Sequence, residues 1–270
     1  MARNQHIPAA RRQRVQRQIL IDGAVSVDQL ARTLEVSLAT VRRDLAWLDA
    51  QGLVRRTHGG AVIEAPRGAD QDFAQREQID AAEKRAMAEA VVASLEPDAT
   101  VFMNDGSTLL AVARAIVARN LRLTVVTPAV NIATLLAEGR AAAVFLLGGS
   151  LRHRSLGTSG PFAETMVRSF NADLALLSAE GLSAEAGLTY SYEADASLAR
   201  LMAERTRRTI ALMTARKLGT RDRIAGLEAA RIDDVITGCH DEACLASLRR
   251  LGVAIKVVGG SVDVAPSPAA

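Results

Sequence analysis

Apolar residues in the first sixty positions recur at helical spacing. They predict three helices at about 9–20, 26–34 and 37–51, followed by a short β-hairpin around Gly59-Gly60. In the third helix Val41, Leu45 and Leu48 share one side, because they stand at positions i, i+4 and i+7. Three helices and a hairpin are the parts of a winged helix-turn-helix, which we expect over residues 8–63.

The opposite side of the third helix is small and basic. Small side chains let a helix approach DNA closely, and arginines then reach phosphates or guanine edges. Ser37 is placed to cap this helix, and with the first-turn N–H groups it can bind a phosphate. We expect Asp44 to pair with a nearby arginine and Trp47 to lie half-buried against the hairpin or the linker. The residues expected on the DNA side are Ala39, Thr40, Arg42 and Arg43.

A different pattern begins after residue 63. Residues 64–78 are polar and contain Pro66 and Gly68, so we expect a linker there. A helix is predicted at about 79–95, and short apolar strands then alternate with helices, which predicts a mostly parallel α/β sheet in a second domain at 79–260. The Pro- and Ala-rich segment 261–270 is expected to be a disordered tail. The predicted strands of the sheet lie at about 100–104, 123–127, 142–147, 174–178, 209–213, 235–237 and 255–258.

Polar side chains and glycines follow three of these strands. Ligands of parallel sheets bind beyond the C-terminal ends of the strands. The loop after the first strand opens a helix, so its hydroxyls and N–H groups form a cradle for an anion. Taken singly, each feature is also an ordinary cap, turn or surface charge, but together they favour a phosphorylated small molecule as the ligand. The residues concerned are Asn104, Asp105, Gly106, Ser107, Thr108, Gly148, Gly149, Arg152 and Lys217.

Composition and charge narrow the class of protein. Hydrophobic residues make up 49% of the 270 residues, and no apolar run approaches the roughly 18 residues of a membrane span. Residues 1–62 carry a net charge of +5 and the remainder −2, which favours a nucleic-acid partner for the first domain. Two cysteines are too few for a disulfide framework, and Cys239-His240 with Cys244 lacks the spacing of a zinc site. We expect a cytoplasmic protein with no metal, cofactor or membrane partner.

The first domain resembles the helix-turn-helix of the DeoR family. The resemblance covers about fifty residues, and its motifs are Ser-x-x-Thr-x-Arg-Arg-Asp-Leu at 37–45 and His-Gly-Gly-Ala at 58–61. It implies that Thr40, Arg42 and Arg43 lie at the DNA. It also implies that Arg55, Arg56 and His58 lie near the wing.

Residues 79–260 resemble the C-terminal sensor domain of the same family, which shares its fold with ribose phosphate isomerase. The resemblance rests on the loop at 104–108, Leu-Leu-Gly-Gly at 146–149 and Lys-Leu-Gly at 217–219, among other motifs. It implies that Gly106, Ser107, Thr108 and Lys217 hold a sugar phosphate, with Gly148 and Gly149 lining the site.

The chain departs from the family pattern at four positions of this second domain. Asn104 replaces the first acid of the loop, Pro128 replaces an Asn, Ala199 replaces a common Lys, and Thr214 replaces an acid. Missing acids weaken contacts to sugar hydroxyls, and a missing Lys weakens anion binding. The effector is therefore altered, or the pocket is degenerate.

The resemblance implies a transcriptional repressor that binds a double-stranded operator of a carbohydrate operon as a homo-oligomer, a dimer or tetramer. A small metabolite would release it. Two alternative functions would use the same two domains: a transcriptional activator, and a constitutive DNA binder whose sensor domain is degenerate. An isomerase-like enzyme is less favoured, because sugar isomerisation needs a carboxylate base and Asn104 and Thr214 occupy the best slots, so we expect no catalytic residue.

Overall fold

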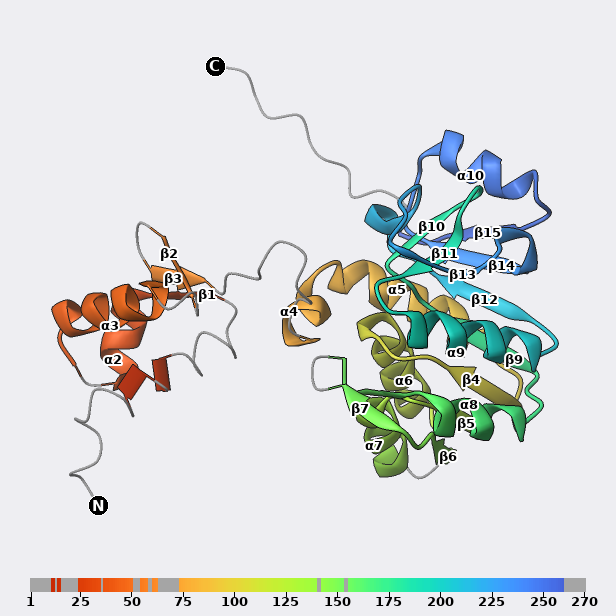
Figure 1. The fold of residues 1–270 in the computed structure, drawn as a ribbon, viewed down its shortest axis with the longest axis horizontal. Helices are drawn as coiled ribbons and strands as arrows, with labels where there is room; N and C mark the ends of the chain where they lie inside the picture. The colour runs from red at the N-terminus through yellow and green to blue at the C-terminus, as the bar shows by residue number, and fades with distance from the viewer. Residues whose placement is uncertain are drawn as a thin grey trace. The chain divides into compact units, whose positions relative to one another are not determined.

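The chain divides into two compact units, residues 1–78 and 79–270, both visible in the computed structural model of Figure 1. The first unit contains a three-stranded sheet, whereas the second is built around a seven-stranded one. The described residues are 11–12, 14–15, 24–34, 36–50, 54–57, 60–62, 73–139, 142–152 and 155–259.

The first unit is a winged helix-turn-helix, as the periodicity predicts. Its core contains Val41, Leu45 and Leu48 of the third helix, packed with Leu30 of the second helix and Val54 before the hairpin. A third strand, β1, precedes the second helix and pairs with β3, which the local pattern did not predict. Residues 11–12 and 14–15, which fall in the predicted first helix, are helical. The further elements are β1 (Ala24–Ser26), α2 (Val27–Leu34), α3 (Leu38–Ala50), β2 (Arg55–Thr57) and β3 (Gly60–Val62).

The segment predicted as a linker contains a helix. Residues Phe73–Gln78 form α4, and Phe73 is only 7% exposed. The boundary between the two units follows Gln78, and residues 64–72 of the predicted linker lie outside the described part of the chain.

The second unit is built on a seven-stranded sheet in the order β15-β14-β12-β9-β4-β5-β6, in which every neighbouring pair is parallel. The prediction of a mostly parallel α/β sheet is confirmed. The strands are β4 (Thr100–Met103), β5 (Thr124–Thr127), β6 (Ala143–Leu146), β9 (Leu174–Leu177), β12 (Thr209–Leu212), β14 (Asp234–Thr237) and β15 (Ala254–Val257).

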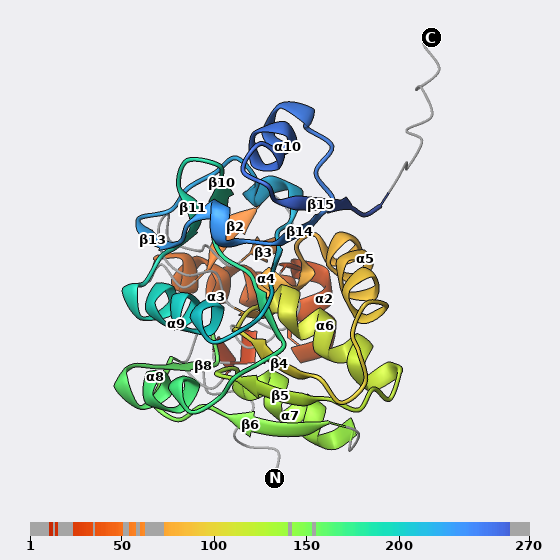
Figure 2. The same cartoon turned by 90° about the vertical axis from the view of Figure 1, so that its right-hand side faces the viewer.

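Helices cover both faces of this sheet. Figure 2 shows α5, α6 and α7 on one side and α8 and α9 on the other. The change of side accompanies a reversal of strand order between β4 and β9, which is where open α/β sheets form ligand crevices. The helices are α5 (Ala81–Val92), α6 (Ser107–Ala118), α7 (Val130–Gly139), α8 (Pro161–Arg168), α9 (Glu193–Glu204) and α10 (Glu242–Arg249).

Two smaller sheets flank the main one, and the hydrophobic pattern did not predict them. Strands β10 (Gly181–Ser183), β11 (Gly187–Tyr190) and β13 (Ile224–Leu227) form an antiparallel sheet, and β7 (Ser150–Arg152) pairs with β8 (Gly157–Ser159). Most of these strands are three or four residues long, too short to display a period of two clearly.

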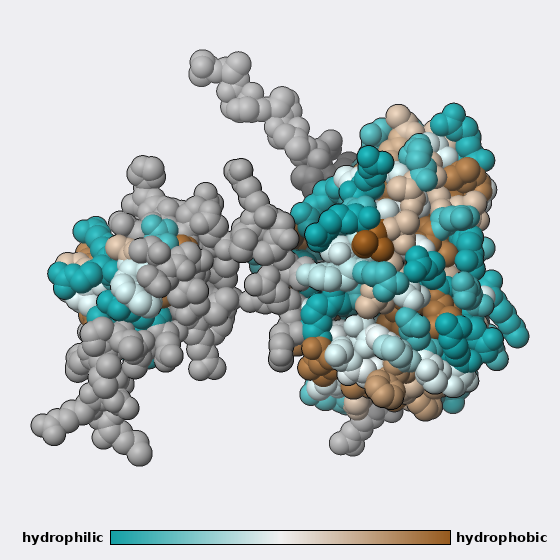
Figure 3. Space-filling view, in the orientation of Figure 1, coloured by the Kyte–Doolittle hydropathy of each residue, from teal (hydrophilic) through white to brown (hydrophobic). Residues whose placement is uncertain are grey.

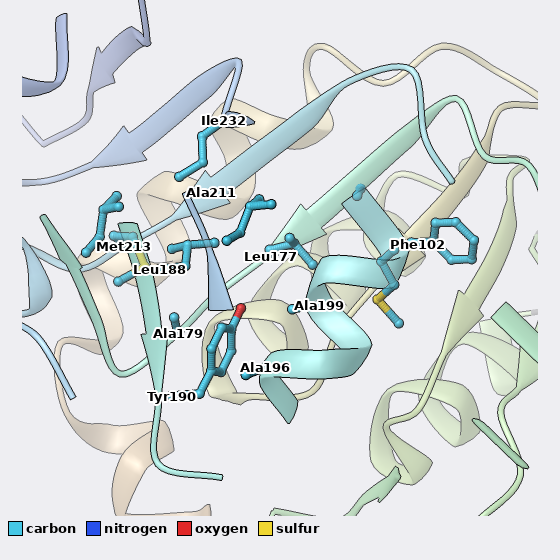
Figure 4. Packing of buried hydrophobic residues seen from close by; sticks show 14 of the residues in the cluster. Phe102, Leu177, Ala179, Leu188, Tyr190, Ala196, Ala199, Ala211, Met213 and Ile232 are labelled. Atoms are coloured by element: carbon cyan, nitrogen blue, oxygen red, sulfur yellow. The ribbon is translucent and has the colours of Figure 1, made fainter. Parts of the chain in front are cut away.

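The core of the second unit is rich in alanine. Figure 4 shows the ring of Tyr190 beside Ala196 of α9, with Ala179 and Ala199 close by. Ala199, at the position where the resemblance implies a Lys, is fully buried and contributes packing in place of charge. On the face shown in Figure 3, hydrophilic side chains are interrupted by small apolar spots.

Candidate functional site

The start of α3 is capped as predicted. The Ser37 hydroxyl accepts the N–H of Thr40 at 3.2 Å, and the two hydroxyl oxygens lie 2.9 Å apart. Ser26 caps α2 in the same way, accepting the N–H of Gln29 at 3.1 Å. Both caps fix the first turn of a helix, because each satisfies a donor that has no intrahelical partner.

The two faces of α3 differ as the spacing predicts. Val41, Leu45 and Leu48 are at most 1% exposed. Ala39, Arg42 and Arg43 are exposed, and Thr40 is half-buried. The helix thus presents two guanidinium groups beside a small residue, the arrangement needed to enter a DNA groove.

Asp44 separates the two faces and is withdrawn from the surface. It is 1% exposed, and its carboxylate accepts from Arg11 Nε at 2.5 Å and from Arg12 Nε at 3.1 Å. The hydrogen bond to Asp44 raises the pKa of Arg11. The expected pairing is confirmed, with two arginines. Because Asp44 is committed to the first helix, it does not neutralise Arg42 and Arg43.

Trp47 lies on the exposed side of α3. The side chain is 42% exposed, and the guanidinium carbon of Arg12 lies 4.4 Å from the ring centroid, a cation–π contact. The sequence did not predict this contact, because Arg12 and Trp47 are brought together only when the first helix packs on α3. Trp47 stands one turn after Arg43, so the tryptophan borders the basic surface.

The remaining predicted DNA residues belong to the hairpin. Arg55 and Arg56 lie in β2, where their backbones pair with Val62 and Ala61 of β3. His58 lies outside the described residues.

In the second unit, the loop after β4 stands at the reversal of strand order. Gly106 precedes α6 with φ of 133°, a conformation that favours glycine. Ser107 and Thr108 form the first turn of α6 and are 9% and 3% exposed. Asn104 is engaged by the backbone of Ser178, since its Nδ2 donates to the carbonyl at 2.8 Å and its Oδ1 accepts the N–H at 3.0 Å. Asn104 therefore joins the ends of β4 and β9.

Asp105 lies against the β7–β8 hairpin, and Arg152 belongs to it. A Cβ at Gly157 would lie 2.6 Å from Asp105 Oδ2, so the glycine lets the carboxylate approach β8. Arg152 is the register partner of Gly157, forms an ion pair with Asp195, and stacks over Tyr192 at 4.4 Å. The predicted Asp105 and Arg152 thus lie on neighbouring segments.

Tyr190 was not predicted and lies close to these acids. The residue is 2% exposed, and its hydroxyl has no hydrogen-bond partner within the described part of the chain. Burial raises the pKa of Tyr190 well above its usual range, and the charges of Glu180, Asp195 and Asp105 raise it further. A buried tyrosine among carboxylates has no signature in a local sequence window, which is why the pattern missed it.

Lys217 and the two glycines complete the strand-end loops. Lys217 ends the short helix η1 (Ala215–Lys217) after β12, and its Nζ donates to the carbonyl of Ala179, just past β9, at 2.6 Å. The ends of β4, β9 and β12 therefore meet, whereas the sequence predicts a site at the ends of β4, β6 and β12. Gly148 and Gly149 lead into β7, and Gly149 has φ of 133°. A Cβ at Gly149 would approach the Ser159 carbonyl oxygen at 2.4 Å.

The described ranges contain neither a metal-binding cluster nor a membrane-spanning helix. Those ranges hold no group of three His, Cys, Asp or Glu side chains arranged for a metal ion. None of their helices combines the length and apolar character of a membrane span.

A basic, capped helix on a winged helix-turn-helix, joined to a parallel α/β unit with a polar strand edge, defines a DNA-binding regulator with a sensor-type domain. Residues 11–67 match the family model of the DeoR-like helix-turn-helix domain, and residues 79–239 match that of the DeoR C terminal sensor domain. The chain belongs to the DeoR family of transcriptional regulators.

Curated relatives extend over most of the chain. The HTH-type transcriptional regulator GlpR of Haloferax volcanii is 34% identical over 92% of this chain and 97% of its own length. The transcriptional repressor AccR of Agrobacterium fabrum is 34% identical over 78% of this chain and 81% of its own. Among solved structures, ribose 5 phosphate isomerase A from Neisseria gonorrhoeae is 12% identical, with a TM-score of 0.38 and 53% of each chain covered.

Proposed function

We propose that this regulator represses a carbohydrate operon by binding its operator through α3. The observation that carries the proposal is the pair Arg42 and Arg43, exposed opposite a buried apolar stripe while Asp44 is held by the first helix. Curated relatives include a putative aga operon transcriptional repressor of Escherichia coli O157:H7, 28% identical over 92% of this chain. A repressor acting on sugar catabolism fits that relationship.

The proposal includes a homo-oligomer. A single helix-turn-helix module offers a small specific area, and dimeric modules gain affinity by reading two half-sites. We therefore expect dimers or tetramers on repeated operator half-sites.

The effector proposed for the second unit is a small phosphorylated metabolite. Its anionic end would lie at the N-terminus of α6, where Ser107 and Thr108 supply N–H and hydroxyl groups, with Lys217 as a cation. Its hydroxyl groups would face the side of Asp105 and Arg152. Because Asn104 is engaged by Ser178, we assign it the role of holding the loop.

The DNA-binding half is tested with the full chain and a duplex from the region upstream of its own gene. Arg42→Ala combined with Arg43→Ala should weaken binding at least about 30-fold, since each specific arginine contact is worth about 1–3 kcal/mol. The matched control removes another adjacent exposed pair, Arg249→Ala with Arg250→Ala in the second unit, and should bind like the wild type. Equal affinities of the two double variants in a mobility-shift titration would overturn the proposal.

The sensor half is tested by thermal-shift screening of sugar phosphates, with glycerol 3-phosphate in the panel. A stabilising compound should also release the duplex, and Lys217→Ala should weaken this response while Lys256→Ala, an exposed lysine on β15, should not. A panel without any hit favours the constitutive binder. Increased reporter expression on deletion of the gene separates repression from activation.

A further inference from the structure

The segment that leads from the first unit into the second is bonded to the ends of two sheet strands. Glu83 lies in the first turn of α5, and its Oε1 accepts the N–H of Ala215 and the N–H of Gly238, each at 2.8 Å. Ala215 follows β12 and Gly238 follows β14, which are neighbours in the sheet. One carboxylate therefore ties the start of α5 to two strand ends.

A second set of contacts holds the same segment, residues 79–84. Asp80 pairs with Arg216 at 2.9 Å, and Lys84, 6% exposed, donates to the carbonyl of Ile79 at 2.6 Å. Asp80 has φ of 55°, a left-handed conformation that is unfavourable for a residue with a side chain. Such a conformation persists only where surrounding contacts determine it, which these contacts do.

Gly238 is shaped for its contact with Glu83. A Cβ at this position would lie 2.6 Å from Glu83 Oε1, so any larger residue would displace the carboxylate. The absence of a side chain at Gly238 is what lets one acid reach both N–H groups.

The turn that receives these contacts also carries Lys217. Ala215 and Arg216 bind the 79–84 segment, and the next residue sends its ammonium group to Ala179 beyond β9. We propose that Glu83 is a positioning residue. Through it, a change in the conformation of the turn at 214–217, which carries Lys217, is coupled to residues 79–84, the segment that leads to the DNA-binding unit. This inference rests on the proposed function. Because coupling is reciprocal, operator binding must in turn change the turn at 214–217.

The test uses hydrogen–deuterium exchange on the full chain, with and without the duplex from the region upstream of its own gene. In the wild type the duplex should change exchange of the amides in 214–217. Glu83→Ala should abolish that change, and Glu83→Gln should retain it, because the amide oxygen still accepts both N–H groups. Glu89→Ala is the control on the same helix, since Glu89 is exposed and pairs with Arg119.

Arg216→Ala provides a second variant should Glu83→Ala fail to fold. It removes a half-exposed ion pair and should change the dissociation constant for the duplex about threefold or more, within the range of mutations that alter coupling. If the wild type binds the duplex but exchange of the amides in 214–217 does not change, the coupling alone is overturned. The same conclusion follows if Arg216→Ala binds the duplex with wild-type affinity. A wild type that does not bind overturns the proposed function and the coupling with it.

Discussion

Replacing Asp44 with Asn should unfold the first unit at a much lower denaturant concentration. The buried Asp44 carboxylate accepts hydrogen bonds from Arg11 and Arg12. An Asn side chain has the shape of Asp but no charge. Its NH₂ group would face the guanidinium groups of Arg11 and Arg12, which are also donors, so a hydrogen bond is lost. Breaking a buried ion pair on one side costs about 3–5 kcal/mol. Because the two arginine side chains are 13% and 24% exposed, water recovers part of that loss, and we expect about 2–3 kcal/mol.

This loss is large for a unit of its size. Small domains have a free energy of unfolding at the low end of about 5–15 kcal/mol. With a urea slope of about 1 kcal/mol per molar, the midpoint should fall by about 2–3 M. Trp47 is the single tryptophan and lies under Arg12, so its fluorescence follows the first unit within the full chain.

The matched control is Asp28→Asn on the exposed side of α2. Asp28 stands in the first helical turn, where a lost negative charge costs at most about 1 kcal/mol. Equal midpoints for Asp44→Asn and Asp28→Asn would refute the reasoning, since Asp44 would then contribute no more than a surface charge.

Two further predictions concern the second unit. Asn104→Asp should lower the free energy of unfolding by about 2 kcal/mol near neutral pH. A carboxylate oxygen would then face the Ser178 carbonyl, to which the Asn104 amide now donates a hydrogen bond. Burial raises the pKa of the introduced acid above its value in the unfolded chain. The loss of stability should therefore be small in acid and grow as the pH rises through the pKa of the folded state. Equal melting temperatures for the wild type and Asn104→Asp near neutral pH would contradict this. Burial raises the pKa of Cys244, and Cys239, Asp241 and Glu185 raise it further, so Ellman's reagent near pH 8 should label the folded Cys239→Ser variant more slowly than the same variant in urea. Equal rates would show that the thiol is not protected.

The local pattern determined the parts of the proposed DNA-binding surface. Val41, Leu45 and Leu48 specify the buried side of α3, and Ser37 caps it, because helical period and capping depend on residues a few positions apart. The exposed Arg42 and Arg43 follow from the same geometry. The strands of the parallel sheet were also predicted, since each is a short apolar run between turn residues.

Tertiary structure alone decided which of these parts touch. The pairing of β1 with β3, the Arg12–Trp47 contact and the hydrogen bonds from Ala215 and Gly238 to Glu83 join segments that have no local signature of one another. From the sequence alone, Glu83 is expected to be a solvent-exposed acid on an amphipathic helix. Only the side-by-side placement of β12 and β14 brings two free backbone N–H groups to it, because sheet order is set by long-range packing and not by neighbours along the chain.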